Sequence, residues 1–496
     1  MTSIPSSEKS TDDADALFSM SLAELSRSIQ RRDISVERVA ETILARVQTL
    51  NPMLHAFITI DAEGMWRSAR QADAALARGD KVGLLHGVPL SVKDHFATRG
   101  LRTTAASKLY ADCVPDFDAT IVERMRDAGA LLIGKANMYE LGTGWGTSGH
   151  FPVALNPWNP AYSPGGSSSG SAVAVATGLG VASLASDGGG STRVPANYCG
   201  VVGLKPTHGR VSFFGSIPES LIAQGQMIAK TISTVGIITR KVEDAAIVLR
   251  VIAGWDSRDP GTEDMGVPDF AVALAGEAHD LVIGVPWAYI ERGVTEENAA
   301  AFAAALNVLR DAGAKVVAVG SPSSLDRLGW MWTTIAYVEM SVLYGDRFTS
   351  SPDEFGPELQ DRIRTGLATS ARSYFLAMQA RIQLRAEWLQ LLKSCDAIAT
   401  PSAPAAPPTM DELVLRRSDL QNIGELARYT RPYNMTGLPA VTVPDGLSAA
   451  GLPLGLQIGG RPFDEATVLR VAEAFERRTP WHRNRPVANA LESGSG

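Results

Sequence analysis

The sequence has few cysteines, no long apolar run and no excess of positive charge. Its 3 cysteines lie far apart without Cys-x-x-Cys spacing, so neither a disulfide framework nor a zinc site is indicated. No run of about 18 apolar residues occurs, which argues against a membrane-spanning helix. The formal net charge of -7 offers no basic surface for phosphates, so neither nucleic acid nor a membrane is an expected partner.

The N-terminus lacks the apolar segment of a secretory signal, and cytoplasm is therefore the expected compartment. We expect a disordered lead-in over residues 1–20, one folded domain over 21–485 and a tail over 486–496. The domain is expected to comprise N-terminal helices (21–80), a core (81–260) and a C-terminal part with a helical, substrate-lining insert (261–485). The sequence leaves a homodimer open.

Strand-like apolar runs alternate with segments of helical periodicity. Two amphipathic helices are predicted within residues 21–50, the second beginning at Ser35, and the pattern is mainly helical between about 323 and 385. Further helices are predicted from 118 to the stop at Gly129, at 171–178 and at 296–312, and strands at 88–92, 131–134, 182–186, 281–286, 315–320, 395–401, 434–444 and 451–460. This alternation predicts an α/β fold in which helices cover both faces of a central mixed, largely parallel, twisted sheet.

The segment from Leu141 to Ser186 contains no Lys, Arg, Asp or Glu. It is rich in Gly, Pro, Ser and Asn, which is unlike a membrane helix. We expect it to pass through the protein interior, where glycine permits close approach of the backbone to a ligand.

One serine-rich loop matches a known nucleophile pattern. Gly166, Ser168 and Gly170 fit G-x-S-x-G, whose serine needs a histidine partner. None of the 7 histidines lies beside an aspartate in such a context. Ser168 is therefore expected to bond the backbone, and Ser169 either to do the same or to cap the following helix.

A second loop is better suited to acyl transfer. Gly188, Gly189 and Gly190 precede Ser191, and consecutive glycines expose backbone N–H groups without side chains that block a substrate carbonyl. We expect these N–H groups, with that of Ser191, to form an oxyanion hole while the Ser191 hydroxyl attacks.

A serine nucleophile needs a base, and Lys93 is the candidate. It ends a short apolar strand. To accept a proton its amine must be neutral, so we expect burial or neighbouring donors to lower its pKa. A salt bridge with Asp94 is the structural alternative.

Seven segments resemble, in order along the chain, motifs of the amidase signature family. They are GVPLSVKD (87–94), GGSSSGSAVAVATG (165–178), SDGGGSTRVPA (186–196), GLKPTHGRVS (203–212), STVGIITRKVEDA (233–245), YNMTGLPAVTVP (433–444) and GLPLGLQIGGRPFDEATVLR (451–470). The likeness extends from about residue 21 to 480, so chance agreement is negligible.

The resemblance implies a Ser-cisSer-Lys triad. Ser191 is the implied nucleophile, Lys93 the base and Ser167 the bridging serine, which in the family lies 24 residues before the nucleophile, as it does here. The peptide bond between Gly166 and Ser167 is implied to be cis.

The resemblance also implies supporting residues and no cofactor or metal. Asp187 and Arg193 are expected to form a structural pair that braces the glycine loop. Met138 and Gly166 are expected to lie at the substrate site.

These residues predict hydrolysis of a carboxamide C–N bond through an acyl-enzyme, with esters and carbamates also open. Segments at about 137–150, 213–231 and 325–385 are expected to line the entrance, and their aromatic and Met content indicates a small apolar or aryl substrate, as in an aryl acylamidase or urethanase. Whether WMWTTIAYVEMSVLY (330–344) packs in the core or lines the pocket stays open.

The alternative is the amidase subunit of a tRNA-dependent glutamine amidotransferase, which works within a multi-subunit assembly. The stretch FFGSIPESLIAQGQMIAKT after GRVS is unlike the usual block of that subunit. The chain also lacks a basic surface signature, so the small-molecule substrate is favoured from the sequence.

Overall fold

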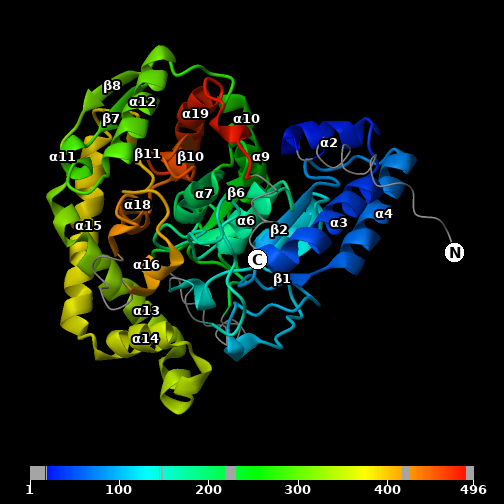
Figure 1. Ribbon diagram of the computed structural model, residues 1–496, viewed down its shortest axis with the longest axis horizontal. Helices are drawn as coiled ribbons and strands as arrows, with labels where there is room; N and C mark the ends of the chain where they lie inside the picture. Colours follow the sequence, from blue (N-terminus) through cyan, green and yellow to red (C-terminus); the bar gives the residue numbers. More distant parts are fainter. Residues whose placement is uncertain are drawn as a thin grey trace.

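One 11-stranded sheet runs through the centre of the molecule (Figure 1). The computed structural model describes residues 17, 19–144, 146, 149–217, 231–415 and 424–486. The strands are β1 (Phe57–Ile60), β2 (Pro89–Lys93), β3 (Leu131–Ala136), β4 (Ala182–Asp187), β5 (Val202–Lys205), β6 (Thr234–Thr239), β7 (Val282–Val285), β8 (Lys315–Ala318), β9 (Ala397–Pro401), β10 (Ala440–Leu447) and β11 (Pro453–Gly460). Their spatial order is β1-β3-β2-β4-β6-β5-β10-β11-β9-β7-β8.

The expected mixed sheet of an α/β fold is confirmed, with a more antiparallel centre than the prediction of a largely parallel sheet. Strands β3, β2 and β4 pair in parallel at one side, and β9, β7 and β8 do so at the other. Every pair between β4 and β9 is antiparallel. The short β10–β11 connection explains part of this, because a parallel pair needs a long crossover.

The helices surround this sheet. They are α2 (Leu22–Gln30), α3 (Val36–Leu54), α4 (Ala62–Arg78), α5 (Thr120–Asp127), α6 (Ser169–Ala176), α7 (Arg193–Cys199), α9 (Val242–Ile252), α10 (Phe270–Ala273), α11 (Trp287–Ile290), α12 (Glu296–Asp311), α13 (Leu328–Ser350), α14 (Pro357–Ala368), α15 (Ala371–Leu391), α16 (Met410–Leu415), α18 (Arg431–Thr436) and α19 (Glu465–Glu476). Helices α6 and α7 pack on one face, and α9, α12 and α19 on the other.

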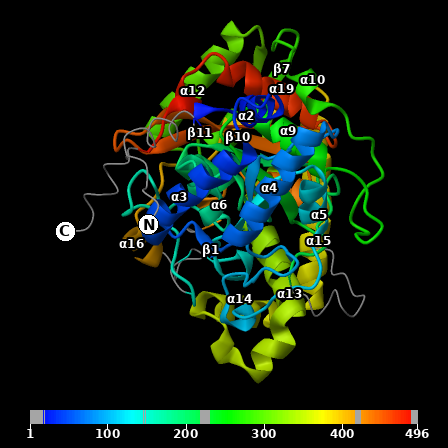
Figure 2. The same cartoon turned by 90° about the vertical axis from the view of Figure 1, so that its right-hand side faces the viewer.

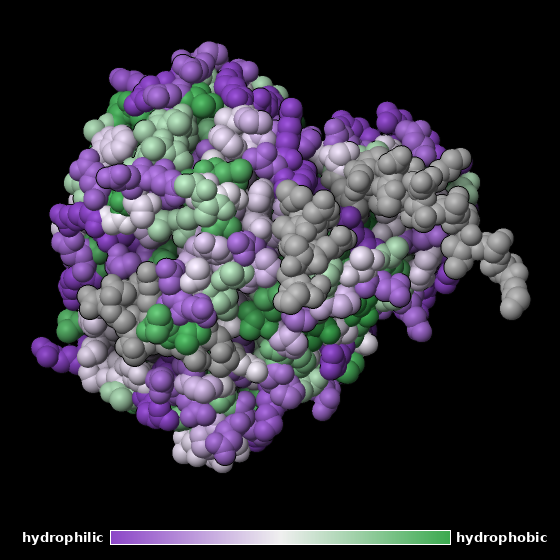
Figure 3. Space-filling view, in the orientation of Figure 1, coloured by the Kyte–Doolittle hydropathy of each residue, from purple (hydrophilic) through white to green (hydrophobic). Residues whose placement is uncertain are grey.

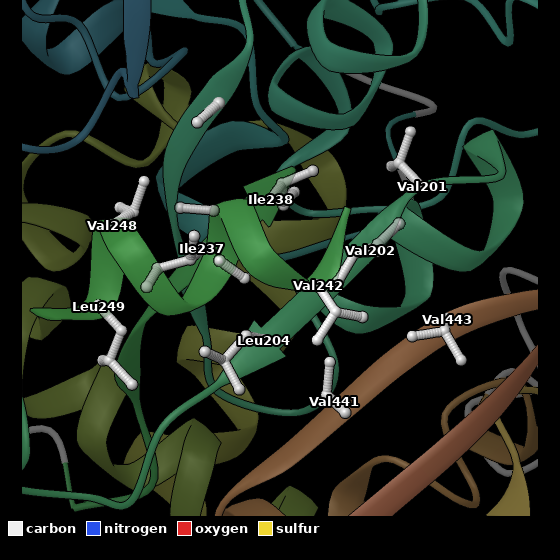
Figure 4. Packing of buried hydrophobic residues seen from close by; sticks show 14 of the residues in the cluster. Val201, Val202, Leu204, Ile237, Ile238, Val242, Val248, Leu249, Val441 and Val443 are labelled. Carbon is white, nitrogen blue, oxygen red and sulfur yellow. The ribbon is translucent and has the colours of Figure 1, made fainter. Parts of the chain in front are cut away.

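The core between α9 and the middle of the sheet consists of branched aliphatic side chains (Figure 4). Val242 and Leu249 of α9 lie against Ile237 of β6, Leu204 of β5 and Val441 of β10, and all five are fully buried. Full burial of each such side chain stabilises the fold by roughly 1.5–3 kcal/mol.

Helices α13, α14 and α15 form a layer at one end of the molecule, and α13 packs on both of the others (Figures 1 and 2). This layer corresponds to the mainly helical region expected at 323–385. Helix α15 contacts α18, which leads into β10. The helical layer is thereby connected to the sheet close to the ends of the central strands.

Most predicted elements are present within a few residues of their expected bounds. Ser35 caps α3 by accepting the Arg38 N–H at 3.1 Å. Strands β1, β5 and β6 have no counterpart among the predicted strands, because runs of four to six residues show too little alternation to identify. Residues 434–436, expected to begin a strand, end helix α18 instead, and Gly437 with φ of 71° terminates that helix.

The uncharged segment enters the interior only in its second half. Residues 163–187 are buried except Gly166, which is half-buried, whereas most residues from 149 to 162 are at least partly exposed. All of α6 is buried. Its small side chains allow the helix to pack closely on β4 and β2.

Hydrophilic and apolar residues intermingle on the face shown in Figure 3. Within the described part of the chain, no helix combines the length and the apolar character needed to cross a bilayer.

Candidate active site

The candidate site lies where three neighbouring strands end. Strands β2, β3 and β4 are parallel, so their carboxyl ends share one edge of the sheet. Lys93 is the last residue of β2 and Asp187 the last of β4. Ligand sites in α/β proteins commonly form at this edge.

Lys93 contacts two serine hydroxyls. Its Nζ donates to Ser167 Oγ at 2.8 Å and to Ser186 Oγ at 3.0 Å, and the lysine side chain is fully buried. Ser186 was not among the predicted site residues, although it directly precedes Asp187 in the quoted SDGGGS motif. A buried amine that faces hydroxyl groups is well placed to exchange protons with them.

Asp94, the alternative partner of Lys93 in the sequence, bonds Thr104 instead. Its carboxylate accepts the N–H of Thr104 at 3.0 Å and also the Thr104 hydroxyl. Burial raises the pKa of Asp94 to about 6, although the nearby charge of Lys135 and the Thr104 contacts lower it. Asp94 therefore belongs to a separate buried group with Lys135 on β3.

The backbone holds Ser167 against Lys93. The Gly166–Ser167 peptide is cis, as the resemblance implies, and the Ser167 carbonyl accepts the Tyr139 N–H at 3.0 Å. The Tyr139 ring covers Gly166 so closely that a Cβ at position 166 would overlap it. The serine is thus fixed on both sides of its peptide.

Five consecutive carbonyls of the loop from Asp187 to Ser191 each accept a hydrogen bond. The donors are Asn434 Nδ2 to Asp187 at 2.9 Å, Trp332 Nε1 to Gly188 at 2.8 Å, Thr430 Oγ1 to Gly189 at 3.0 Å, Val194 N to Gly190 at 2.7 Å and Ser168 N to Ser191 at 3.1 Å. In a trans peptide the N–H points away from the carbonyl of the same unit. These bonds therefore set the direction of the N–H groups of residues 188–191.

One of those N–H groups is already used. Gly190 donates to Asp187 Oδ1 at 2.7 Å, and Thr192 donates to Asp187 Oδ2 at 3.2 Å. Gly190 was predicted as an oxyanion donor, but its N–H is directed at this carboxylate. Gly188, Gly189 and Ser191 are the remaining candidates for that role.

Asp187 and Arg193 are brought together as a fully buried ion pair. Arg193 Nη2 lies 2.9 Å from Asp187 Oδ1, and its Nε donates to Oδ2 at 3.0 Å. Arg193 Nη1 also donates to Gln457 Oε1 on β11 at 2.8 Å. Desolvation opposes the charged form, yet Arg193 and its hydrogen bonds hold the pKa of Asp187 well below its usual range.

A cavity of about 150 Å³ opens beside these groups. Ser167, Ser186 and Ser191 line it together with Gly166 and the glycine loop 188–190. Aromatic and apolar side chains make up much of the remaining wall, namely Phe213, Ile232, Trp332, Ala336, Tyr337, Met340, Leu343, Tyr344 and Leu426. Two buried arginines, Arg362 and Arg431, also line it.

Helix α13 carries the aromatic cluster whose position the sequence left open. Trp332, Tyr337 and Met340 line the cavity, whereas Met331 is buried in the core. Helix α14 contributes Arg362 to the wall. Of the expected entrance segment 213–231, Phe213 lines the cavity, and residues 218–230 lie outside the described residues.

Three residues expected at the loop or the substrate site are placed elsewhere. Met138 is buried and is not part of the cavity lining. Ser168 is also fully buried, and its hydroxyl donates to the Ser186 carbonyl at 3.2 Å. Ser169 is the first residue of α6 and makes no side-chain cap, since Ser168 occupies the N-cap position.

The titratable clusters expected of a metal centre do not occur in the described ranges. No group of three or more His, Cys, Asp or Glu side chains there is arranged to hold a metal ion. Residues at the cavity that could bind an anionic group are Arg362 and Arg431.

Known proteins share this architecture over nearly the whole chain. The sequence profile of the family described as Amidase matches residues 38–469. A curated relative from Roseiflexus sp. (strain RS-1), a Glutamyl-tRNA(Gln) amidotransferase component, is 40% identical over 499 residues, which cover 95% of this chain and 98% of the relative.

Two solved structures illustrate the range of relatives. The corresponding Glutamyl-tRNA(Gln) amidotransferase component from Thermotoga maritima is 32% identical with a TM-score of 0.75, covering 94% of each chain. The 6-aminohexanoate cyclic dimer hydrolase complexed with substrate is 27% identical with a TM-score of 0.83, covering 96% of this chain and 99% of that structure.

The partners expected from the sequence need correction. A small-molecule substrate with no nucleic acid partner was predicted from the net charge, and this prediction is wrong in view of relatives whose name specifies a tRNA-linked amidotransferase. Net charge averages the whole surface. It therefore cannot exclude nucleic acid for a protein that is one component of an enzyme.

Proposed function

Because this chain belongs to the amidase family and acts on amide bonds, we propose that Ser191 cleaves a carboxamide C–N bond through an acyl-enzyme. The observation that carries the proposal is the 2.8 Å contact between Lys93 Nζ and Ser167 Oγ beside the cavity that also exposes Ser191. A hydroxyl held against a buried amine can relay a proton between that amine and the nucleophile.

In the proposed acylation step, Ser191 Oγ bonds to the amide carbon while its proton passes to Ser167 and a proton from Ser167 passes to neutral Lys93. The N–H groups of Gly188, Gly189 and Ser191 stabilise the negative oxygen of the tetrahedral intermediate. Lys93 then returns its proton through Ser167 to the leaving nitrogen as the C–N bond breaks. Water attacks the Ser191 ester in the second half-reaction, and its proton follows the same route before Ser191 is regenerated.

Asp187 and Arg193 support this arrangement from below. The Asp187 carboxylate accepts N–H groups from both sides of Ser191, at Gly190 and Thr192. Arg193 holds that carboxylate in place through two hydrogen bonds. The pair therefore fixes the turn that presents the nucleophile.

We further propose that the amide is the side chain of glutamine, within a tRNA-dependent amidotransferase of which this chain is the amidase subunit. Support comes from the relatives, since the Roseiflexus protein is 40% identical and both chains are covered almost completely. The two buried arginines at the cavity, Arg362 and Arg431, supply positive charge that suits a substrate carrying a carboxylate.

An apolar or aryl amide is the second candidate, and the wall of the cavity favours it. Trp332, Tyr337 and Met340 present apolar surface toward the space beside Ser191. The TM-score to the cyclic dimer hydrolase, 0.83, also exceeds the 0.75 to the amidotransferase component.

Ammonia release tests both substrates with one assay. We expect the purified chain to release ammonia from glutamine with a higher kcat/KM than from hexanamide, and Ser191→Ala to abolish both. A preference for hexanamide would select the second candidate. Unchanged hydrolysis by Ser191→Ala would refute the nucleophile assignment for either substrate.

A further inference from the structure

Trp332 of helix α13 binds the backbone of the glycine loop directly. Its indole Nε1 donates to the Gly188 carbonyl at 2.8 Å. The ring also lies against the next residue, because a Cβ on Gly189 would be 2.8–3.0 Å from three indole atoms. The side chain thus contacts both residues that share the Gly188–Gly189 peptide.

This peptide has no side chain of its own to fix its orientation. Glycine residues rotate about φ and ψ more freely than any others. The neighbouring units are held by the loop's own turn and by residues of the motifs, as in the Gly189–Gly190 peptide, whose N–H bonds Asp187 and whose carbonyl bonds Thr430. For the Gly188–Gly189 peptide, the hydrogen bond from Trp332 performs this task at the carbonyl end.

The indole is itself held from the opposite side. The Arg431 guanidinium lies 4.1 Å from the ring centroid, a cation–π contact, and the Tyr337 ring meets it edge to face at 6.2 Å. Arg431 is 7% exposed. Trp332 is therefore packed between the glycine loop and a buried cation from helix α18.

We propose that Trp332 is a positioning residue of the oxyanion hole. By binding the Gly188 carbonyl, its N–H turns the Gly189 N–H toward the developing negative oxygen of the substrate. The inference rests on the proposed function, since it requires that Ser191 forms a tetrahedral intermediate at this loop. It adds that helix α13, which lines the substrate cavity, also sets the rate of the chemical step.

Two substitutions separate the hydrogen bond from the apolar surface of the ring. Trp332→Phe keeps an aromatic ring and removes the donor. Trp332→His removes the fused benzene ring, but its Nε2 can occupy the position of the indole nitrogen because both belong to five-membered rings. Trp330→Phe is the matched control, since Trp330 lies two residues away on α13 and is 38% exposed.

We expect Trp332→Phe to lower kcat roughly 10-fold with little change in KM, a part of the 100- to 1,000-fold loss typical when an oxyanion donor is removed outright. Trp332→His should raise KM, because apolar surface is lost, and retain more of kcat than Trp332→Phe. Trp330→Phe should match the wild type. Wild-type kcat in Trp332→Phe, or a kcat in Trp332→His no higher than in Trp332→Phe, would overturn the proposal.

A covalent probe makes the test independent of the natural substrate. An alkyl phosphonofluoridate bonds its phosphorus to Ser191 Oγ, releases fluoride, passes the serine proton to the base and develops negative charge on an oxygen in the oxyanion hole. We expect Trp332→Phe to slow labelling of Ser191 roughly 10-fold by peptide mass spectrometry, with melting temperatures confirming that each variant is folded. If Trp332→Phe does not fold, Trp332→Met serves as the donor-free variant.

The outcomes distinguish the two levels of the account. Labelling of Ser191 at an equal rate in Trp332→Phe and the wild type would refute the role of Trp332 and leave the proposed function standing. Labelling of the wild type at a residue other than Ser191 would refute both.

Discussion

Nζ of Lys93 lies 2.8 Å from Oγ of Ser167, although 74 residues separate them in the chain. The lysine ends strand β2, and the serine precedes the buried helix α6, which packs on β2 and β4. Because the same amine also contacts Ser186 on β4, two adjacent parallel strands and one helix start converge on it. This convergence is the structural basis of the proposed proton relay.

Replacement of the Lys93 amine should remove the base. We expect Lys93→Met to lower kcat at least about 100-fold, the lower limit of typical general-base contributions. Lys135→Met is the matched control, since Lys135 is a fully buried lysine on the neighbouring strand whose Nζ binds the Phe96 carbonyl and Thr98 Oγ1. Steady-state kinetics should show nearly unchanged kcat for folded Lys135→Met, and an equal loss in both variants would contradict the assignment.

The Asp187–Arg193 pair should be a large contributor to stability. Asp187→Asn leaves the Arg193 charge buried without its carboxylate, which we expect to cost about 3–5 kcal/mol of unfolding free energy. The exposed pair Arg364–Asp361 gives the comparison, and Arg364→Ala should change stability by less than about 1 kcal/mol. Urea denaturation followed by circular dichroism measures both, and similar small losses would show that the buried pair does not brace the loop.

Two glycines should respond oppositely to alanine. Gly166→Ala places a methyl group inside the Tyr139 ring, so we expect lost activity and a lower melting temperature. Gly329 lies exposed in α13, and a Cβ there meets no atom within 4 Å. Gly329→Ala should therefore stabilise the protein by roughly 0.5–1 kcal/mol. Calorimetric melting of both variants would contradict this account if Gly166→Ala melted at the wild-type temperature.

Asp445 on β10 should make stability depend on pH. Burial raises the pKa of this carboxyl from 3.8 to about 7, and the side chain is 5% exposed. Between those values the native state keeps a proton that the unfolded chain has lost, so stability falls as the pH rises from about 4 to 7.

Asp445→Asn should abolish this dependence, because the amide carries no charge at any of these pH values. At pH 8 the variant should be more stable than the wild type, with an upper limit of about 4 kcal/mol at 1.4 kcal/mol per pKa unit. At pH 4 the two should be similar. Denaturation midpoints at both pH values test the prediction, and equal midpoints at pH 8 would show that the buried carboxyl is compensated.

The sequence predicted those parts of the site that depend on short motifs. The fold class followed from alternating strands and helices, and the resemblance is confirmed by the family profile. Lys93 and Ser167 could be paired only through the resemblance, since no periodicity indicates that a strand end and a loop 74 residues later meet.

Long-range contacts explain what the sequence did not reveal. Asn434, Thr430 and Trp332 bind carbonyls of the glycine loop from more than 140 residues away. Ser186 faces Lys93 only because β2 and β4 pair in parallel. Net charge misled the expectation about partners, because it carries no information on which surface meets another protein chain.

The most direct test of the central claim is the location of the acyl group. The protein is mixed with a 4-nitrophenyl ester, quenched in acid during turnover, digested and mapped by mass spectrometry. The account predicts the acyl mass on Ser191 in the wild type and its absence in Ser191→Ala. An acyl group on Ser168 or on another residue, with Ser191 unmodified, would contradict it.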